Sequence, residues 1–133
     1  MTRLVLDASV AVHLASLVAV PASLARFECF APPLMWSESI SALLEATFRG
    51  ALPDAELDRA VERLEGLEIT VATVDSEHRR RAIQIARSLG WAKSYDAEYV
   101  ALAQRLECPL LTVDARLSRG VNKLVELVGP AWL

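Results

Sequence analysis

The 133-residue sequence predicts an α/β fold in which helices cover both faces of a central parallel sheet. Two observations lead to this prediction. Short apolar runs alternate along the chain with segments whose apolar residues recur at helical spacing, which is typical of parallel sheets. No linker, repeat or low-complexity segment divides the sequence, and a chain of this length that is 53% hydrophobic can form one core without disulfides. We therefore expect one domain over residues 1–133.

The first half of the chain is expected to form two strands and three helices. In chain order these are a strand at residues 3–6, a helix at 8–20, a strand at 27–31, a helix at 36–49 and a helix that begins at Pro53. The first strand is a short apolar run that ends at Asp7. Pro21 stops the helix that follows, and Gly50 ends the next one, because neither residue continues a helix well.

The second half is expected to add three strands and two long helices. In chain order these are a strand at 69–74, a helix at 76–89, a helix at 95–106, a strand at 109–113, a short helical turn to 120 and a strand at 124–128. The first of these strands is rich in β-branched residues. Asp75 or Ser76 is expected to cap the first helix, which Gly90 closes, and Ser94 to cap the second.

Composition and the N-terminus suggest where the protein works. No apolar run reaches the roughly 18–20 residues that a membrane-spanning helix needs. The first residues do not resemble a signal peptide, because Asp7 interrupts a very short apolar stretch. Cys29 and Cys108 lie far apart and in no metal-ligand spacing, which indicates free thiols in a reducing compartment. We therefore expect a cytoplasmic protein without a membrane partner.

Four acidic residues from distant parts of the chain are expected to meet at one edge of the sheet. Asp7 and Asp114 each follow a predicted strand directly, and ligands of α/β proteins bind outside the carboxyl ends of the strands. Glu38 and Asp96 lie in or near the first turns of two helices, and helix starts in such folds face the same crevice. The four carboxylates can therefore converge.

A cluster of four carboxylates is expected to bind a cation. Carboxylates packed together repel one another, which raises their pKa values and costs stability. A hard divalent cation reverses this balance, and oxygen ligands without His or Cys select Mg²⁺ or Mn²⁺, which can polarise a phosphate and activate water. The net charge of −3 neither supports nor excludes a nucleic-acid substrate, because a metal site concentrates acids that its cations neutralise.

Four blocks of the sequence resemble the signature blocks of PIN domains. Three of them are residues 4–10 (LVLDASV), 94–103 (SYDAEYVALA) and 111–114 (LTVD). The fourth is Pro32-Pro33 followed by a helix that Glu38 opens. The small one-domain size is similar to that of VapC-type toxins of toxin–antitoxin pairs.

This resemblance implies an endoribonuclease that depends on Mg²⁺ or Mn²⁺ and leaves a 5′-phosphate and a 3′-hydroxyl on RNA. It implies that the catalytic metal ligands are Asp7, Glu38, Asp96 and Asp114. It also implies a homodimer and a cognate VapB-type antitoxin. The apolar helices at 36–49 and after Pro53 agree with such partners, because they carry more apolar surface than a small core needs.

Several neighbouring residues leave alternatives open. Ser9, Ser94 and Thr112 flank the acids and could hydrogen-bond the carboxylates or a metal-bound water, although capping or local hydrogen bonding would serve equally well. Glu45 competes with Glu38, because the residues around Glu38 are more polar than is usual in the family. Glu98 lies roughly 200° round the helix from Asp96 and is expected to face away from the site.

The sequence leaves two alternatives to an endoribonuclease. A phosphatase of the haloacid-dehalogenase type needs a second Asp two residues after the first, where this sequence has Ser9, and no glycine-rich phosphate loop is present. A PIN-like protein that has lost catalysis and only binds a partner is the other alternative. The presence of all four acids favours an active enzyme.

Overall fold

Five parallel strands form one sheet in the order β3-β2-β1-β4-β5. The strands are β1 (Thr2–Leu6), β2 (Phe27–Ala31), β3 (Ile69–Val71), β4 (Leu110–Leu111) and β5 (Leu127–Val128). This is a computed structural model that describes residues 1–133, apart from the side chains of Ala115, Ser118 and Trp132. The central strand β1 is buried on both faces, and Leu4, Val5 and Leu6 are 0% exposed. That burial explains why these three residues form an unbroken apolar run.

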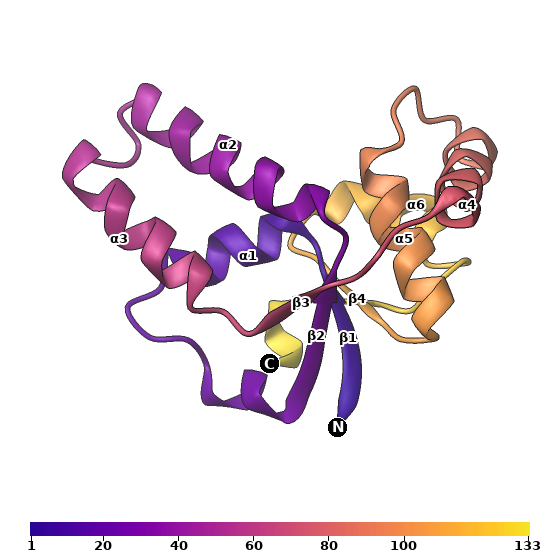
Figure 1. The fold of residues 1–133 in the computed structure, drawn as a ribbon, viewed down its shortest axis with the longest axis horizontal. Helices are drawn as coiled ribbons and strands as arrows, with labels where there is room; N and C mark the ends of the chain where they lie inside the picture. Colours follow the sequence, from indigo (N-terminus) through magenta and orange to yellow (C-terminus); the bar gives the residue numbers. More distant parts are fainter.

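Helices cover both faces of the sheet, as the sequence predicts. They are α1 (Ala8–Ala15), α2 (Leu34–Phe48), α3 (Asp54–Glu65), α4 (Ser76–Ser88), α5 (Tyr95–Leu106) and α6 (Ser118–Val121), with short 3₁₀ turns at Ala22–Arg26, Ala115–Leu117 and Pro130–Trp132. Figure 1 shows α1, α2 and α3 on one side and α4, α5 and α6 on the other. This separation follows from right-handed crossovers, because the chain moves outward in one direction up to β3 and in the other direction from β4.

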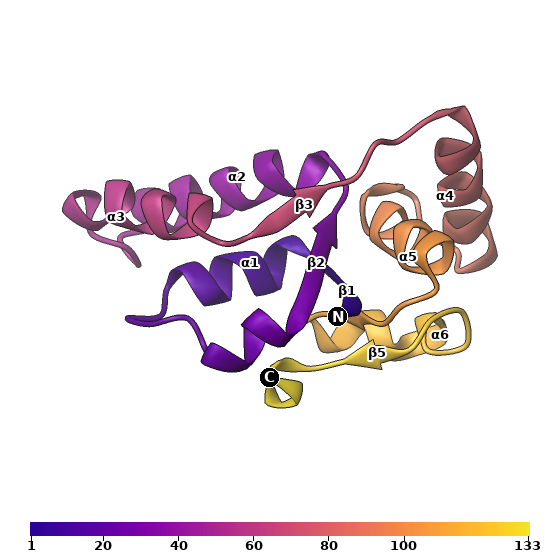
Figure 2. The ribbon, with the colours of Figure 1, turned by 60° about the horizontal axis from the view of Figure 1, so that its bottom comes forward.

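The change of direction lies between β1 and β4, which are neighbours in the sheet. Helices α1 and α5 therefore leave and approach this point on opposite faces, as Figure 2 shows. Ligands of open α/β sheets bind outside the carboxyl ends of the strands at such a point. Asp7 comes directly after β1, so it lies where this rule places a site.

Three strands and one helix are shorter in the structure than the sequence predicts. The helix after Asp7 ends at Ala15 instead of continuing to residue 20, and most of the residues beyond it are exposed: Leu17 still packs against the core, but Val18 is fully exposed. Strand β4 stops at Leu111 because its neighbour β1 ends at Leu6, where the chain turns into α1. Strands β3 and β5 are short for the same reason, since a ladder lasts only as long as both of its strands.

The core continues into α5, which is buried over most of its length between the sheet and α4. Cys29 is buried and Cys108 half-buried, and both are free thiols, as expected. Within the described part of the chain, no helix combines the length and the apolar character that crossing a membrane requires.

Candidate active site

An open groove of about 550 Å³ lies at the carboxyl edge of the sheet. Three segments form its walls: the start of α2, the loop between α4 and α5, and the chain after β4. Its lining residues are Glu38, Gly90, Trp91, Ala92, Lys93, Tyr95, Asp96, Asp114, Arg116 and Leu117. Three of the four predicted acids therefore share this groove.

Asp7 is the most deeply buried of the four acids, at 5% exposure. It caps α1: its carboxylate Oδ1 accepts the backbone N–H of Val10 at 3.0 Å and the hydroxyl of Ser9 at 2.5 Å. Burial raises the pKa of Asp7, hydrogen bonds from Ser9, Thr112 and Val10 lower it, and the negative charge of Asp114 raises it further. Asp7 is thus a desolvated carboxylate held by a set of donors.

Ser9 and Thr112, two of the predicted neighbours, connect Asp7 to the chain after β4. The hydroxyl of Ser9 accepts the backbone N–H of Val113 at 3.3 Å while it donates to Asp7. The hydroxyl of Thr112 accepts the N–H of Asp114 at 3.0 Å while it also hydrogen-bonds Asp7. These two hydroxyl relays fix the position of Asp7 relative to Asp114, although Asp114 lies three residues beyond the end of β4.

The prediction that the Ser94 side chain caps α5 is wrong. It precedes α5 but has helical backbone angles, and its side chain makes no capping hydrogen bond. A capping residue normally adopts an extended conformation so that its side chain can reach the free N–H groups, and the helical angles at Ser94 prevent this.

Glu38 lies in the second turn of α2, because the helix begins at Leu34, two residues before its predicted start. Its carboxylate Oε1 accepts the hydroxyl of Tyr99 at 2.6 Å, which links α2 to α5. Burial raises the pKa of Glu38, the bond from Tyr99 lowers it, and the charges of Asp96, Asp7 and Glu98 raise it again. Glu38 is therefore close enough to the other acids to be repelled by them.

Tyr99 is a site residue that the sequence analysis missed. It is only 1% exposed, and its hydroxyl donates from within the core to Glu38, which lines the groove. The available signal was its spacing, because Tyr99 follows Asp96 by three residues and side chains at that spacing share one face of a helix.

Asp96 is the second residue of α5 and is exposed to the groove. Loss of surrounding water raises its pKa, and the negative charges of Asp7 and Asp114 add to this effect, while Arg116 opposes it. Asp96 thus interacts with acids from two other segments of the chain. This is the convergence that the strand-end and helix-start positions predicted.

Asp114 is paired with Arg116, a second residue that the sequence analysis missed. The guanidinium donates from Nε to Oδ1 at 3.0 Å and from Nη2 to Oδ2 at 2.8 Å, and the backbone N–H of Arg116 also donates to Oδ1. These bonds hold the pKa of Asp114 below its usual range. The Arg116 side chain is otherwise 89% exposed, so only this fork holds it at the groove.

The acids are electrostatically coupled but do not form a closed metal cage. Among the side chains that the structure describes, no three of the His, Cys, Asp and Glu type are grouped closely enough to hold one ion. The donor set nevertheless fits a hard divalent cation, because it consists of carboxylate oxygens. Asp7, Glu38 and Asp96 also have pKa values raised in part by one another's negative charge, which a cation between them would relieve.

Two other glutamates considered in the sequence analysis, Glu45 and Glu98, do not line this groove. Glu45 is exposed on the last turns of α2, beside Leu44 and Phe48. Glu98 is not among the residues that line the groove, yet its negative charge raises the pKa of Glu38. Of the acids on α2, the structure therefore places Glu38 at the candidate site.

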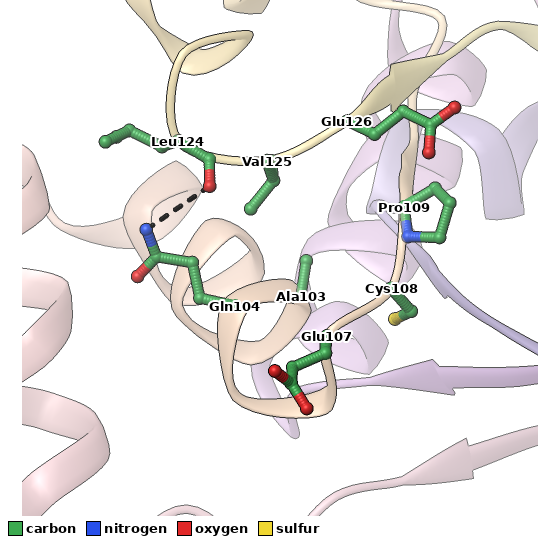
Figure 3. Close-up of a pocket in the computed structure, with 8 residues that line it drawn as sticks. All are labelled: Ala103, Gln104, Glu107, Cys108, Pro109, Leu124, Val125 and Glu126. Atoms are coloured by element: carbon green, nitrogen blue, oxygen red, sulfur yellow. Dashed lines mark hydrogen bonds between the residues drawn. The ribbon is translucent and has the colours of Figure 1, made fainter.

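A second pocket, of about 370 Å³, lies at the opposite edge of the sheet (Figure 3). Pro109 and Glu126 line it just before β4 and β5 begin, so it faces the amino ends of the strands. The side-chain amide of Gln104 donates to the carbonyl of Leu124 at 3.5 Å across this pocket. None of the four coupled acids reaches it, so the candidate chemistry belongs to the groove.

A family model described as PIN domain matches residues 4–122. No curated protein matches the sequence.

Solved structures show the same fold at low sequence identity. PAE2754 from Pyrobaculum aerophilum has a TM-score of 0.71 at 17% identity, over 98% of this chain and 92% of that one. VapBC2 from Rickettsia felis, solved bound to a DNA fragment from its promoter, has a TM-score of 0.69 at 10% identity, over 96% and 98%. VapBC-1 from nontypeable Haemophilus influenzae has a TM-score of 0.65 at 13% identity, over 96% and 98%.

Proposed function

This chain belongs to the PIN-domain family, and from that membership and its acidic groove we propose that it is a divalent-metal-dependent endoribonuclease of the VapC toxin type. PIN domains are generally nucleases. One observation supports the proposal most directly: Glu38, Asp96 and Asp114 face one open groove, and the buried Asp7 is coupled to all three. Capping or surface solvation does not require acids from four segments to meet.

The proposed ligands of the metal are Asp7, Glu38, Asp96 and Asp114, with Mg²⁺ or Mn²⁺ as the ion. When bound, such an ion polarises the scissile phosphate and lowers the pKa of the attacking water. RNA is the proposed substrate, with a 5′-phosphate and a 3′-hydroxyl as products.

The protein's own side chains hold these carboxylates in place. Tyr99 fixes the carboxylate of Glu38 from the core side, so the remaining oxygen is directed to the groove. Ser9 and Thr112 orient Asp7 through the two relays described above. Polar partners of this kind orient metal ligands and tune their affinity. Arg116 is suited to phosphate once Asp114 binds a cation, because its guanidinium is exposed apart from that pair.

A VapB-type antitoxin and a second copy of the chain are the proposed partners, in the cytoplasm. The similarity to the two VapBC structures supports this proposal at the level of the fold. So does the surface of α2: Leu43 is buried, whereas Leu44 is 51% and Phe48 96% exposed, which leaves apolar surface outside the core.

The activity is tested with purified protein and a labelled, unstructured RNA in Mg²⁺, Mn²⁺ or chelator. We expect cleavage that requires the metal and that Asp96→Asn abolishes, while Glu45→Gln, an exposed acid outside the groove, serves as the matched control. Glu38→Gln and Asp114→Asn should also lose much of the activity. Full activity in chelator or in Asp96→Asn would refute the proposal. A folded protein that cleaves no RNA in either metal would favour a PIN domain that only binds a partner.

The partner is tested by co-expression with the small reading frame next to this gene. We expect the product to co-purify with this chain and to relieve growth arrest. If it does neither, and the protein alone runs as a monomer, the toxin–antitoxin part of the proposal fails while the nuclease part is unaffected.

A further inference from the structure

The loop before α5 forms one wall of the acidic groove and carries side chains that the catalytic proposal does not use. Trp91, Lys93 and Tyr95 all line the groove from this loop and from the first residue of the helix. Tyr95 is 54% exposed, so much of its aromatic side chain is accessible at the groove. Lys93 is exposed as well.

Resting on the proposed nuclease function, we propose that Tyr95 and Lys93 form a nucleotide subsite, in which the Tyr95 ring stacks on an unpaired base next to the scissile phosphate and Lys93 contacts the RNA backbone. The ligand is therefore single-stranded RNA at the position of the cut. Tyr95 is a specificity-determining residue in this assignment, and it does not take part in the bond-breaking step.

The position of Tyr95 supports a role in binding. It immediately precedes Asp96, so a base on its ring lies within one nucleotide of a phosphate at the acids. Aromatic rings that bind single-stranded nucleic acid present an exposed face on which a base can stack, and every base offers such a face. Among the described residues, the side chain of Tyr95 has no hydrogen bond or ion pair, so its exposed ring is not committed to the protein's own structure.

The loop beneath Tyr95 is held in one conformation, which favours a preformed subsite. Gly90 ends α4 with φ +72°, a left-handed conformation that suits glycine. The backbone N–H of Trp91 then donates to the carbonyl of Ala86 at 2.8 Å, and the Trp91 side chain packs against the core. A platform that is already ordered binds with a smaller entropic cost than one that must be ordered by the ligand.

The charges of the groove support a backbone contact at Lys93. Arg116 is paired with Asp114, and its charge lowers the pKa of Asp96. Lys93 has no ion pair among the described residues and is not among the groups that shift the pKa of Asp96 or Asp114. Its positive charge is therefore available at the rim, beyond the acids. RNA approaching an acidic groove needs such a cation, because phosphates and carboxylates repel one another.

This geometry selects against double-stranded RNA. A base inside a duplex is stacked above and below and paired at its edge, so it cannot lie on an external ring without being extruded. A base in a single-stranded segment is already unpaired, so it can stack on the ring without being extruded. The subsite thus adds a requirement for an unpaired nucleotide at the cut.

Binding is tested separately from cleavage, with a fluorescent eight-nucleotide single-stranded RNA and Ca²⁺ in place of Mg²⁺. Stacking of one base predicts that Tyr95→Ala weakens the dissociation constant by roughly ten- to a hundredfold. Tyr95→Phe keeps the ring and should restore binding to within about twofold of the wild type. RNAs that lack one base at successive positions should weaken wild-type binding at one position, and Tyr95→Ala should remove that dependence.

Lys93 is tested by the salt dependence of the same binding equilibrium. Lys93→Gln should lower the slope of log affinity against log salt concentration by about 0.7, the value for one phosphate contact on a single strand. Lys123→Gln is the matched control, because Lys123 is exposed outside the groove. Thermal melts of each variant confirm that the fold is retained.

The outcomes separate the subsite from the nuclease proposal. If the wild type cleaves RNA but Tyr95→Ala binds and cleaves like it, the subsite is refuted while the nuclease proposal holds. If base removal and Tyr95→Ala are coupled in binding but no RNA is cut, the subsite holds and the nuclease proposal fails. Equal binding of single-stranded RNA and of a duplex of the same sequence also refutes the subsite.

Discussion

Removing the Tyr99 hydroxyl tests how Glu38 is held in the groove. The substitution Tyr99→Phe keeps the buried ring and deletes one bond, the 2.6 Å hydrogen bond from the Tyr99 hydroxyl to Oε1 of Glu38. Hydrogen bonds to charged groups contribute roughly 1.5–3 kcal/mol. Because Glu38 is half-buried and lines an open groove, water can replace part of the bond, so we expect the free energy of unfolding to fall by about 1–2 kcal/mol.

The loss should depend on pH in a defined direction. The bond from Tyr99 lowers the pKa of Glu38, so it stabilises the folded protein only while that carboxylate is ionised. The contribution is complete at neutral pH and is lost as the pH falls through the raised pKa of Glu38 toward its ordinary value of 4.5. In chelator, the wild type should therefore melt about 4–8 °C above Tyr99→Phe at pH 7.5, and the gap should close by about pH 4.5.

The assay is thermal unfolding followed by circular dichroism, combined with Mn²⁺ titration calorimetry. Loss of a polar partner of a metal ligand typically weakens metal binding about ten- to a hundredfold, so Tyr99→Phe should bind Mn²⁺ at least about tenfold more weakly. Glu45→Gln, on the same helix but outside the groove, should match the wild type in both measurements. A Tyr99→Phe protein with wild-type melting at every pH and wild-type Mn²⁺ affinity would show that the bond does not position Glu38.

Four further substitutions test the charges around the groove and the core. Asp7→Asn or Asp96→Asn should abolish RNA cleavage yet leave the metal-free melting temperature unchanged or higher, because each removes a charge that raises the pKa values of its neighbours. Arg116→Gln should bind Mn²⁺ several-fold more tightly by calorimetry, because the guanidinium no longer competes for Asp114; weaker binding would mean that Arg116 supports the site. His78→Leu should melt at or above the wild type at pH 7.5, since both ring nitrogens of His78 are buried without a hydrogen-bond partner among the side chains that the structure describes. Burial and then the charge of an arginine lower the pKa of His78 below 6.5, so the wild type should lose stability relative to His78→Leu as the pH falls through about 6.5.

Most of the fold could be predicted because its signals are local and strong. Each of the five strands overlaps a strand that the sequence predicts, and the start of α5 at Tyr95 was predicted to the residue. The ends of strands were not predictable from these runs. Val113 continues the apolar run of β4 but is 42% exposed, because no neighbouring strand extends that far. Strand length thus depends on partners that a single run does not reveal.

The four acids could be predicted because their positions follow from topology, whereas the side chains that hold them could not. Tyr99 and Glu38 are 61 residues apart, and their bond depends on how closely α5 approaches α2. The distance between two helices is set by packing, which periodicity does not encode. Arg116 is a more local case, since it lies two residues after Asp114. Its fork still depends on the turn that follows β4 and not on the spacing alone.

The polar partners also explain why coupled acids remain apart without a cation. Asp7 has the donors of α1, Glu38 has Tyr99, and Asp114 has Arg116, so each of these carboxylates has a separate source of stabilisation. Asp96 is the exception among the four in the described structure, because it has no hydrogen bond or ion pair and is repelled by Asp7 and Asp114. A divalent cation bound as proposed would therefore gain most at Asp96 and would have to displace most at Asp114, where Arg116 already occupies both oxygens. The proposed metal affinity would then depend on that exchange as much as on the carboxylates themselves.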